Sequence, residues 1–102
     1  MVFLIVNGKL DTKLVSIEGV LQSPTSSVTI AAGRVQEFTI LFNTPKNART
    51  QPFDAYIQST GWEGVICQGV AIVGNNVTFT LYNATPNVKE VIPKCVALYF
   101  VY

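Results

Sequence analysis

The segment GVICQGVAIVGNNVTFTLYN, residues 64–83, predicts a β-hairpin. Gly74, Asn75 and Asn76 lie at its centre, and Gly and Asn are the residues that tolerate the positive φ of a tight turn. In the return strand, apolar and polar residues alternate with a period of two, as in a strand with one buried face. The alternation places Val77, Phe79 and Leu81 on one face and Thr78, Thr80 and Tyr82 on the other.

Two segments before the hairpin carry the same pattern, on either side of a loop with two prolines. In residues 34–42, the period of two places Phe38, Ile40 and Phe42 on one face and Glu37, Thr39 and Leu41 on the other. In residues 53–60, it places Phe53, Ala55 and Ile57 inward and Asp54, Tyr56 and Gln58 outward. Residues 94–102 are apolar on both faces. We expect that last strand to be covered on both sides, by the core and by a neighbouring subunit.

The first 26 residues contain shorter apolar runs, VFLIV, KLVSI and VLQ, separated by polar residues. We expect two parts in the chain: residues 1–26, which form N-terminal strands or an oligomerisation arm, and residues 27–102, which form the main domain. The segments are spaced like strands and no crossover helix separates them, which excludes a parallel sheet. The pattern favours an all-β antiparallel fold, a β-sandwich or a small barrel, with an extra N-terminal strand or arm.

Charged residues are scarce. Seven Lys and Arg and six Asp and Glu make up 13 per cent of the chain, against about 25 per cent in an average soluble domain. We infer that other copies of the chain cover part of the surface, so that the protein is an obligate oligomer. The net charge of +1 is not gathered in a basic block, which argues against a nucleic-acid partner. The opening MVFLIV is too short for a secretory signal or a membrane span.

Residue types that carry catalysis are scarce too. The chain has no histidine, and Cys67 and Cys95 are 28 positions apart without other ligands, so we expect neither a metal site nor a cofactor. We interpret both cysteines as free, buried apolar residues, although pairing is an alternative. Asp54 and Glu63 are the best candidates for a glycosidase pair, but we interpret them as solvated charges at strand ends. The expected catalytic set is empty.

A small-ligand site is easier to motivate. Trp62 and Glu63 lie on a Gly-bounded loop after the outward row Asp54, Tyr56 and Gln58. An aromatic ring can stack on a sugar while carboxylates and amides bind its hydroxyls. Arg49, in the long loop, completes this candidate site. The alternatives are that Trp62 packs at the sandwich end or in a subunit contact, and that Arg49 is solvated.

The segments VTIAAGRVQEFTILFNTP, FDAYIQST, VTFTLYNATPN and VALYFVY occur in this order over residues 27–102. Their order and spacing resemble the H-type-lectin-like domains at the C-termini of bacteriophage and prophage tail fibres. The resemblance implies a six-stranded sandwich in a homotrimer that recognises host-surface saccharide. It further implies a place in the virion, beside other tail proteins, without insertion into a membrane.

Two departures from the animal lectins of this type bear on the site. Those lectins carry a Trp-His pair where this chain has Asn83-Ala84-Thr85, and an Arg that has no counterpart in VICQGV. Their sugar site is therefore not transferable. We predict a non-enzymatic receptor-binding head domain. The alternatives are a purely structural oligomerisation or adaptor domain of a phage tail or fibre and, less favoured, a glycan-cleaving tip.

Overall fold

A computed structural model describes residues 5–6, 9–10, 16–48 and 51–101 of the chain. Within these residues every regular element is a β-strand, and all strand pairs are antiparallel. The strands are β1 Ile5–Val6, β2 Lys9–Leu10, β3 Ser16–Gln22, β4 Val28–Ile30, β5 Val35–Leu41, β6 Asp54–Ser59, β7 Val65–Val73, β8 Asn76–Asn83, β9 Lys89–Val91 and β10 Lys94–Val101. The predicted all-β fold is confirmed.

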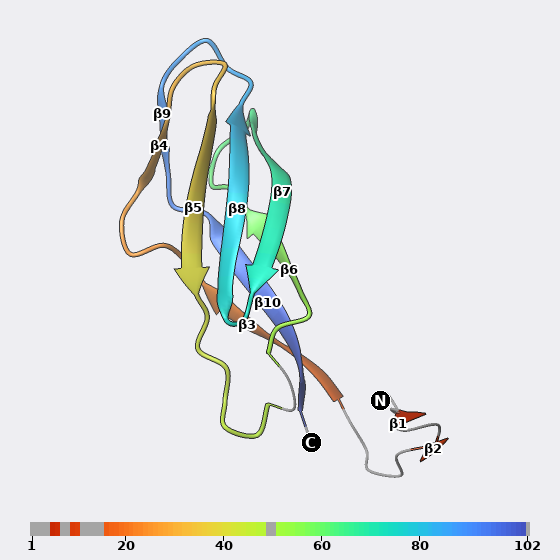
Figure 1. Ribbon diagram of the computed structural model, residues 1–102. Helices are drawn as coiled ribbons and strands as arrows, with labels where there is room; N and C mark the ends of the chain where they lie inside the picture. The colour runs from red at the N-terminus through yellow and green to blue at the C-terminus, as the bar shows by residue number, and fades with distance from the viewer. Residues whose placement is uncertain (1–4, 7–8, 11–15, 49–50, 102) are drawn as a thin grey trace.

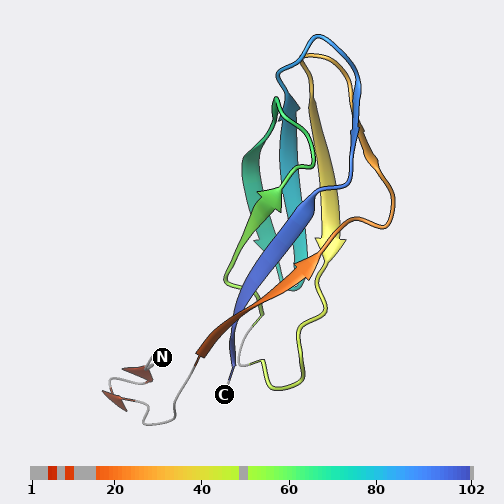
Figure 2. The ribbon, with the colours of Figure 1, turned by 180° about the vertical axis from the view of Figure 1, so that it is seen from behind.

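Two three-stranded sheets form the layers of a sandwich (Figure 1). One layer has the order β5-β8-β7, and the other, seen from its own side in Figure 2, has the order β3-β10-β6. Five of these six strands come from residues 27–102, and the sixth, β3, comes from the N-terminal part, for which an extra strand or arm was expected. Strands β1 and β2 pair with each other.

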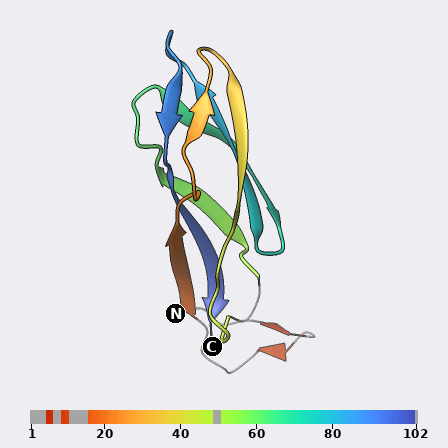
Figure 3. The same cartoon turned by 90° about the vertical axis from the view of Figure 1, so that its left-hand side faces the viewer.

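The short pair β4-β9 continues the second layer (Figure 3). Along the chain, β3 leads into β4 and β9 leads into β10, so the two pairs form one antiparallel ribbon with an interruption. Pro24 and Pro93 lie in the interruption, where they supply no ladder hydrogen bond. The interruption leaves five residues, 23–27, between β3 and β4, against two between β9 and β10.

The hairpin predicted over residues 64–83 is present as β7 and β8. Gly74 in its turn has a φ of 62°. The side chain of Asn75 donates hydrogen bonds to the carbonyl of Phe42 (2.9 Å) and to Oγ1 of Thr44 (3.1 Å), which ties the turn to the end of β5. The predicted inward residues of β8, Val77, Phe79 and Leu81, are completely buried.

The core consists of two clusters between the layers. The lower cluster joins both sheets and contains Ile40, Phe42, Ala55, Val77, Phe79, Cys95 and Ala97. The upper cluster packs the β4-β9 pair against the hairpin and contains Val28, Ile30, Val65, Leu81 and Val91. Strand β8 contributes buried residues to both clusters, and Phe38, Ile57 and Cys67 pack against both, so the two halves of the core are continuous.

The predicted faces of residues 34–42 are confirmed: Ile40 and Phe42 are buried and Phe38 is half-buried against the core, whereas the predicted outward residues Glu37, Thr39 and Leu41 are exposed. In the segment 53–60 the prediction for Phe53 is wrong. Phe53 precedes β6, is 44% exposed, and stacks on Phe100 with ring centroids 4.5 Å apart. Alternation holds only within a regular strand, and Phe53 lies just outside one, directly after Pro52.

Strand β3 pairs with β10 over its whole length, from Ser16 opposite Val101 to Gln22 opposite Cys95. This strand, which lies before residue 27, thus completes the sandwich. The central strand β10 buries Cys95 and Ala97 in the core. On its other face Val96 is buried beneath its neighbours, whereas Leu98 and Phe100 remain half-buried, so this chain covers that face only in part.

Candidate functional site

The loop that connects β6 to β7 is closed by side-chain hydroxyls. Oγ1 of Thr60 donates to the carbonyl of Trp62 (2.8 Å) and accepts the amide of the same residue (3.4 Å). Oγ of Ser59 accepts the amide of Gly61 (3.1 Å). Gly61 and Gly64 have φ values of 80° and 82°, in a region that residues with a Cβ rarely adopt. The loop is therefore a defined turn, and Trp62 is held at its tip.

The Trp62 side chain is 49% exposed and belongs to neither core cluster. One face of its ring is occupied, because Nζ of Lys89 lies 4.0 Å from a ring centroid in a cation–π contact. Gly61, Trp62 and Glu63 line a shallow depression of about 430 Å³. Trp62 thus packs against β9 with one face and presents the rest of its surface to solvent.

The predicted outward row on β6 is confirmed, since Asp54, Tyr56 and Gln58 are exposed. Oδ1 of Asp54 accepts the amide of the next residue, Ala55 (2.8 Å). Tyr56 lies opposite Val96 of the central strand β10, on the outer surface of the β3-β10-β6 sheet. The row therefore faces the outside of this layer, while Trp62 lies beyond the end of β6 and contacts β9. Arg49 is outside the described residues.

Asp54 and Glu63 do not have the spacing of a glycosidase pair. Asp54 begins β6, whereas Glu63 lies four residues beyond its other end, in the β6–β7 loop. A strand rises about 3.3 Å per residue, so the length of β6 alone is roughly 16 Å. Two catalytic carboxyl groups of a glycosidase lie within about 10 Å of each other.

The two thiols are free. Cys95 is completely buried in the lower core cluster, and burial raises its pKa to about 12, with a further contribution from the nearby Cys67. Sγ of Cys67 donates to the carbonyl of Gly69 (3.4 Å). Since the thiolate is the reactive form, this environment makes Cys95 a core residue rather than a nucleophile.

Apart from Asp54 and Gln58 of β6, the outer surface of the β3-β10-β6 sheet is largely apolar. From β3 come Ile17 and Leu21, both about half exposed, with Gly19 between them. On β10, Phe100 lies opposite Ile17, Leu98 opposite Gly19, and Val96 opposite Leu21. We call this surface the outer apolar face; its members are Ile17, Leu21, Phe53, Tyr56, Val96, Leu98 and Phe100.

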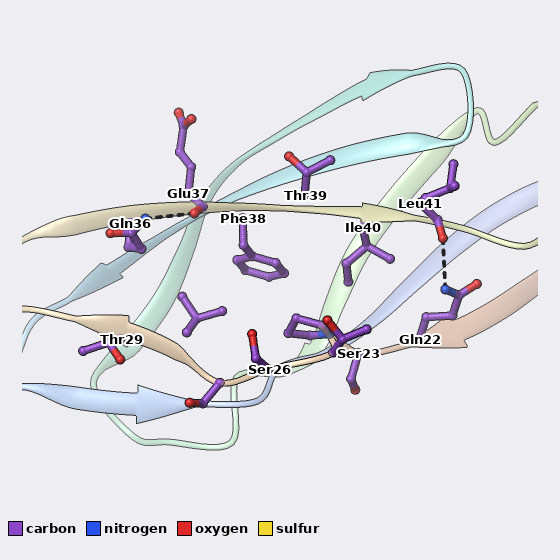
Figure 4. Close-up of a pocket in the computed structure, with 14 residues that line it drawn as sticks. Gln22, Ser23, Ser26, Thr29, Gln36, Glu37, Phe38, Thr39, Ile40 and Leu41 are labelled. Atoms are coloured by element: carbon purple, nitrogen blue, oxygen red, sulfur yellow. Dashed lines mark hydrogen bonds between the residues drawn. The ribbon is translucent and has the colours of Figure 1, made fainter.

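A second concavity, which the sequence interpretation missed, lies on the side of the sandwich where β5 has no neighbouring strand (Figure 4). It is a groove of about 620 Å³ between β5 and residues 22–29. One signal was present in the sequence: the segment SPTSS, residues 23–27, interrupts two strand patterns with hydroxyl side chains. Nothing local, however, indicated that this segment faces β5.

Within the part of the chain that the structure describes, no group of three or more His, Cys, Asp or Glu is arranged to hold a metal ion. The same residues include no helix long and apolar enough to cross a membrane. The chain was compared with models of protein families, with curated proteins and with solved structures, and nothing matched.

Proposed function

We propose that the protein is a non-catalytic recognition module, the head domain of a virion tail fibre or related receptor-binding protein, which binds host-surface saccharide as a homotrimer. The observation that carries this proposal is the presentation of Trp62, half exposed on a turn that Ser59 and Thr60 close with hydrogen bonds. The resemblance of residues 27–102 to tail-fibre lectin-like domains supports the same function.

An exposed ring on an ordered turn is suited to stacking on the apolar face of a sugar, because little conformational entropy is lost on binding. The Glu63 carboxylate, in the same depression, accepts hydrogen bonds from sugar hydroxyls. Lys89 holds one ring face, so the sugar stacks on the remaining exposed surface. Such a site is shallow and weak by itself, and three copies in one trimer strengthen it through effective concentration.

The test is glycan-array binding and adsorption to host cells by Trp62→Ala and Trp62→Phe variants, with the oligomer mass followed by light scattering. We expect Trp62→Ala to lose binding with its mass unchanged and Trp62→Phe, which keeps an aromatic surface, to retain most of it. If Trp62→Ala binds saccharide like the unmodified protein, or if the unmodified protein binds none of the host polysaccharides offered, the proposal is wrong.

The outer apolar face favours a second candidate function, a structural oligomerisation or adaptor domain without a ligand. Exposed apolar patches of this kind on a small domain mark interaction surfaces. On the outer apolar face, the only acidic residue from the described strands is Asp54, at one end of β6. A second apolar face can therefore pack on this surface at little desolvation cost.

Leu21→Asp tests this second candidate, with Val73→Asp as the matched control. Leu21 lies on the outer apolar face, while Val73 is 75% exposed at the end of the opposite sheet. We expect Leu21→Asp to dissociate the oligomer and Val73→Asp to leave it intact. Oligomers that survive Leu21→Asp would show that subunits do not meet on this face, and a monomer at high concentration would contradict self-association altogether.

A further inference from the structure

The groove beside β5 has the size of a small-ligand site. Its volume of about 620 Å³ lies within the range of about 300–1,000 Å³ that is usual for such sites. Phe38 and Ile40 project into it from β5, and Ser23 and Ser26 face them from the segment that joins β3 to β4 (Figure 4). The ring of Phe38 is fixed, because it stacks on Phe79 with centroids 5.4 Å apart.

The lining is polar but almost free of charge. Hydroxyl and amide side chains predominate, among them Gln22, Ser23, Ser26 and Gln36. Thr39 also borders the groove, but its side chain points away in Figure 4 and shares a hydrogen bond with Oγ1 of Thr78 (2.8 Å). Among the described residues that line the groove, Glu37 alone is charged, and its carboxylate points away from the cavity in Figure 4. A groove without cations offers no counter-charge to a phosphate, sulfate or carboxylate, so its chemistry suits a neutral ligand with many hydroxyl groups.

The free edge of β5 is already capped at two places, which disfavours a peptide strand as the occupant. The Gln22 amide spans one end: Nε2 donates to the carbonyl of Leu41 (3.2 Å), and Oε1 accepts the amide of Asn43 (2.6 Å). Nearer the other end, Nε2 of Gln36 donates to the carbonyl of Glu37 (3.0 Å). A strand added to β5 would need these same backbone groups, whereas a ligand bound by side-chain hydroxyls would not.

We propose that this groove is a binding site for a short neutral oligosaccharide, separate from the Trp62 loop. The sugar lies with an apolar C–H face toward Phe38 and Ile40, and its hydroxyls exchange hydrogen bonds with Gln36, Ser23 and Ser26. This proposal does not rest on the Trp62 site: the two sites are built from different elements, β5 with residues 22–29 and the β6–β7 loop.

The proposal is tested by titrating the ¹⁵N-labelled protein with neutral glucose, mannose and N-acetylglucosamine oligosaccharides. Heparin oligosaccharides and a synthetic β-strand peptide are the comparison ligands. We expect a neutral oligosaccharide to shift the amide signals of residues 22–29 and 36–41. Shifts confined to residues 60–64 would overturn the groove proposal while supporting the Trp62 site. No shifts in residues 22–29 and 36–41 with any neutral sugar would overturn the groove proposal alone, because the Trp62 site has its own test. Stronger binding of heparin or of the peptide in the groove would also overturn it.

Two variants address the groove directly. Gln36→Ala removes one amide, and we expect about a fivefold loss of affinity, the usual effect of one hydrogen bond. Gln68→Ala is its matched control, since Gln68 is an exposed glutamine on β7, at the opposite edge of the same sheet. Ser26→Phe fills the groove and should abolish binding, while Trp62→Ala should leave it unchanged. Equal affinities of Gln36→Ala and Gln68→Ala would overturn the proposal even if Ser26→Phe failed to fold.

Discussion

Asn83 is a completely buried polar residue whose amide is fully used. Nδ2 donates to the carbonyls of Ile30 (3.0 Å) and Asn87 (2.7 Å). Oδ1 accepts the amide (3.0 Å) and the hydroxyl (2.6 Å) of Thr85. One side chain thus joins the end of β4 to the loop after β8. The neighbouring amide of Ala84 donates to the carbonyl of Gly64 (2.7 Å), which links this network to the Trp62 loop.

Replacement of Asn83 by Ala removes all four hydrogen bonds. Each contributes about 1 kcal/mol net. The Thr85 hydroxyl keeps a second partner, the carbonyl of Asn87 at 3.0 Å, so losing its hydrogen bond to Asn83 costs little. We therefore expect the free energy of unfolding to fall by about 3 kcal/mol, out of a total of about 5–15 kcal/mol for a domain.

Urea unfolding, followed by the fluorescence of the single tryptophan and by circular dichroism, measures this loss. The midpoint should fall by roughly 1 to 3 M for Asn83→Ala. Asn76→Ala is the matched control, because Asn76 is an exposed asparagine at the other end of β8, and we expect a change below about 0.5 kcal/mol. If both variants unfold at the same urea concentration, the network does not hold this end of the sandwich together.

Asn83→Asp adds a test by pH. The second carboxylate oxygen would face the carbonyls of Ile30 and Asn87, so the folded state should raise the pKa of the new carboxyl above its usual value of about 3.9. With a raised folded-state pKa, the contribution of this carboxyl to stability is fully present below about pH 4 and is lost as the pH rises. A stability deficit relative to the unmodified protein that is the same at pH 4 and pH 7 would contradict this description.

Three further predictions concern stability. Gly64→Ala should lower the free energy of unfolding by at least about 2 kcal/mol, because φ is +82° and a Cβ would lie 2.5 Å from a Thr85 methyl group. Its control Gly33→Ala, at φ +66° with open space around it, should lower it by about 1 kcal/mol, and equal losses in thermal unfolding would contradict the packing argument. Burial raises the pKa of Cys95 from 9.0 to about 12, so the thiol ionises at lower pH in the unfolded state, and the free energy of unfolding should decrease above pH 9, less steeply in Cys95→Ala. In the native protein the Cys95 thiol should also alkylate far more slowly than that of Cys67, and equal alkylation rates by mass spectrometry would refute the burial of Cys95. Gln22→Ala should cost about 1–2 kcal/mol in urea unfolding by freeing two backbone groups of the β5 edge, and an unchanged midpoint would show that water replaces the amide fully.

The strands of the sandwich were largely predictable, because the burial that fixes them follows a local alternation. Val77, Phe79 and Leu81 are buried as their period of two requires, and Gly74 makes the turn where its conformational freedom is needed. The same reasoning failed at Phe53, where the strand has not yet begun and the ring instead meets Phe100, 47 positions away.

The candidate sites depended on contacts that no local pattern contains. The sequence by itself determined that Trp62 lies on a glycine-bounded loop and that Asp54, Tyr56 and Gln58 point outward. Only the tertiary structure decided that Lys89 covers one face of the Trp62 ring and that Gln22 reaches Leu41 to form one end of the groove. The physical reason is that side-chain alternation is set by neighbours along one strand, whereas the facing of two loops or edges depends on how separate strands pack across the core.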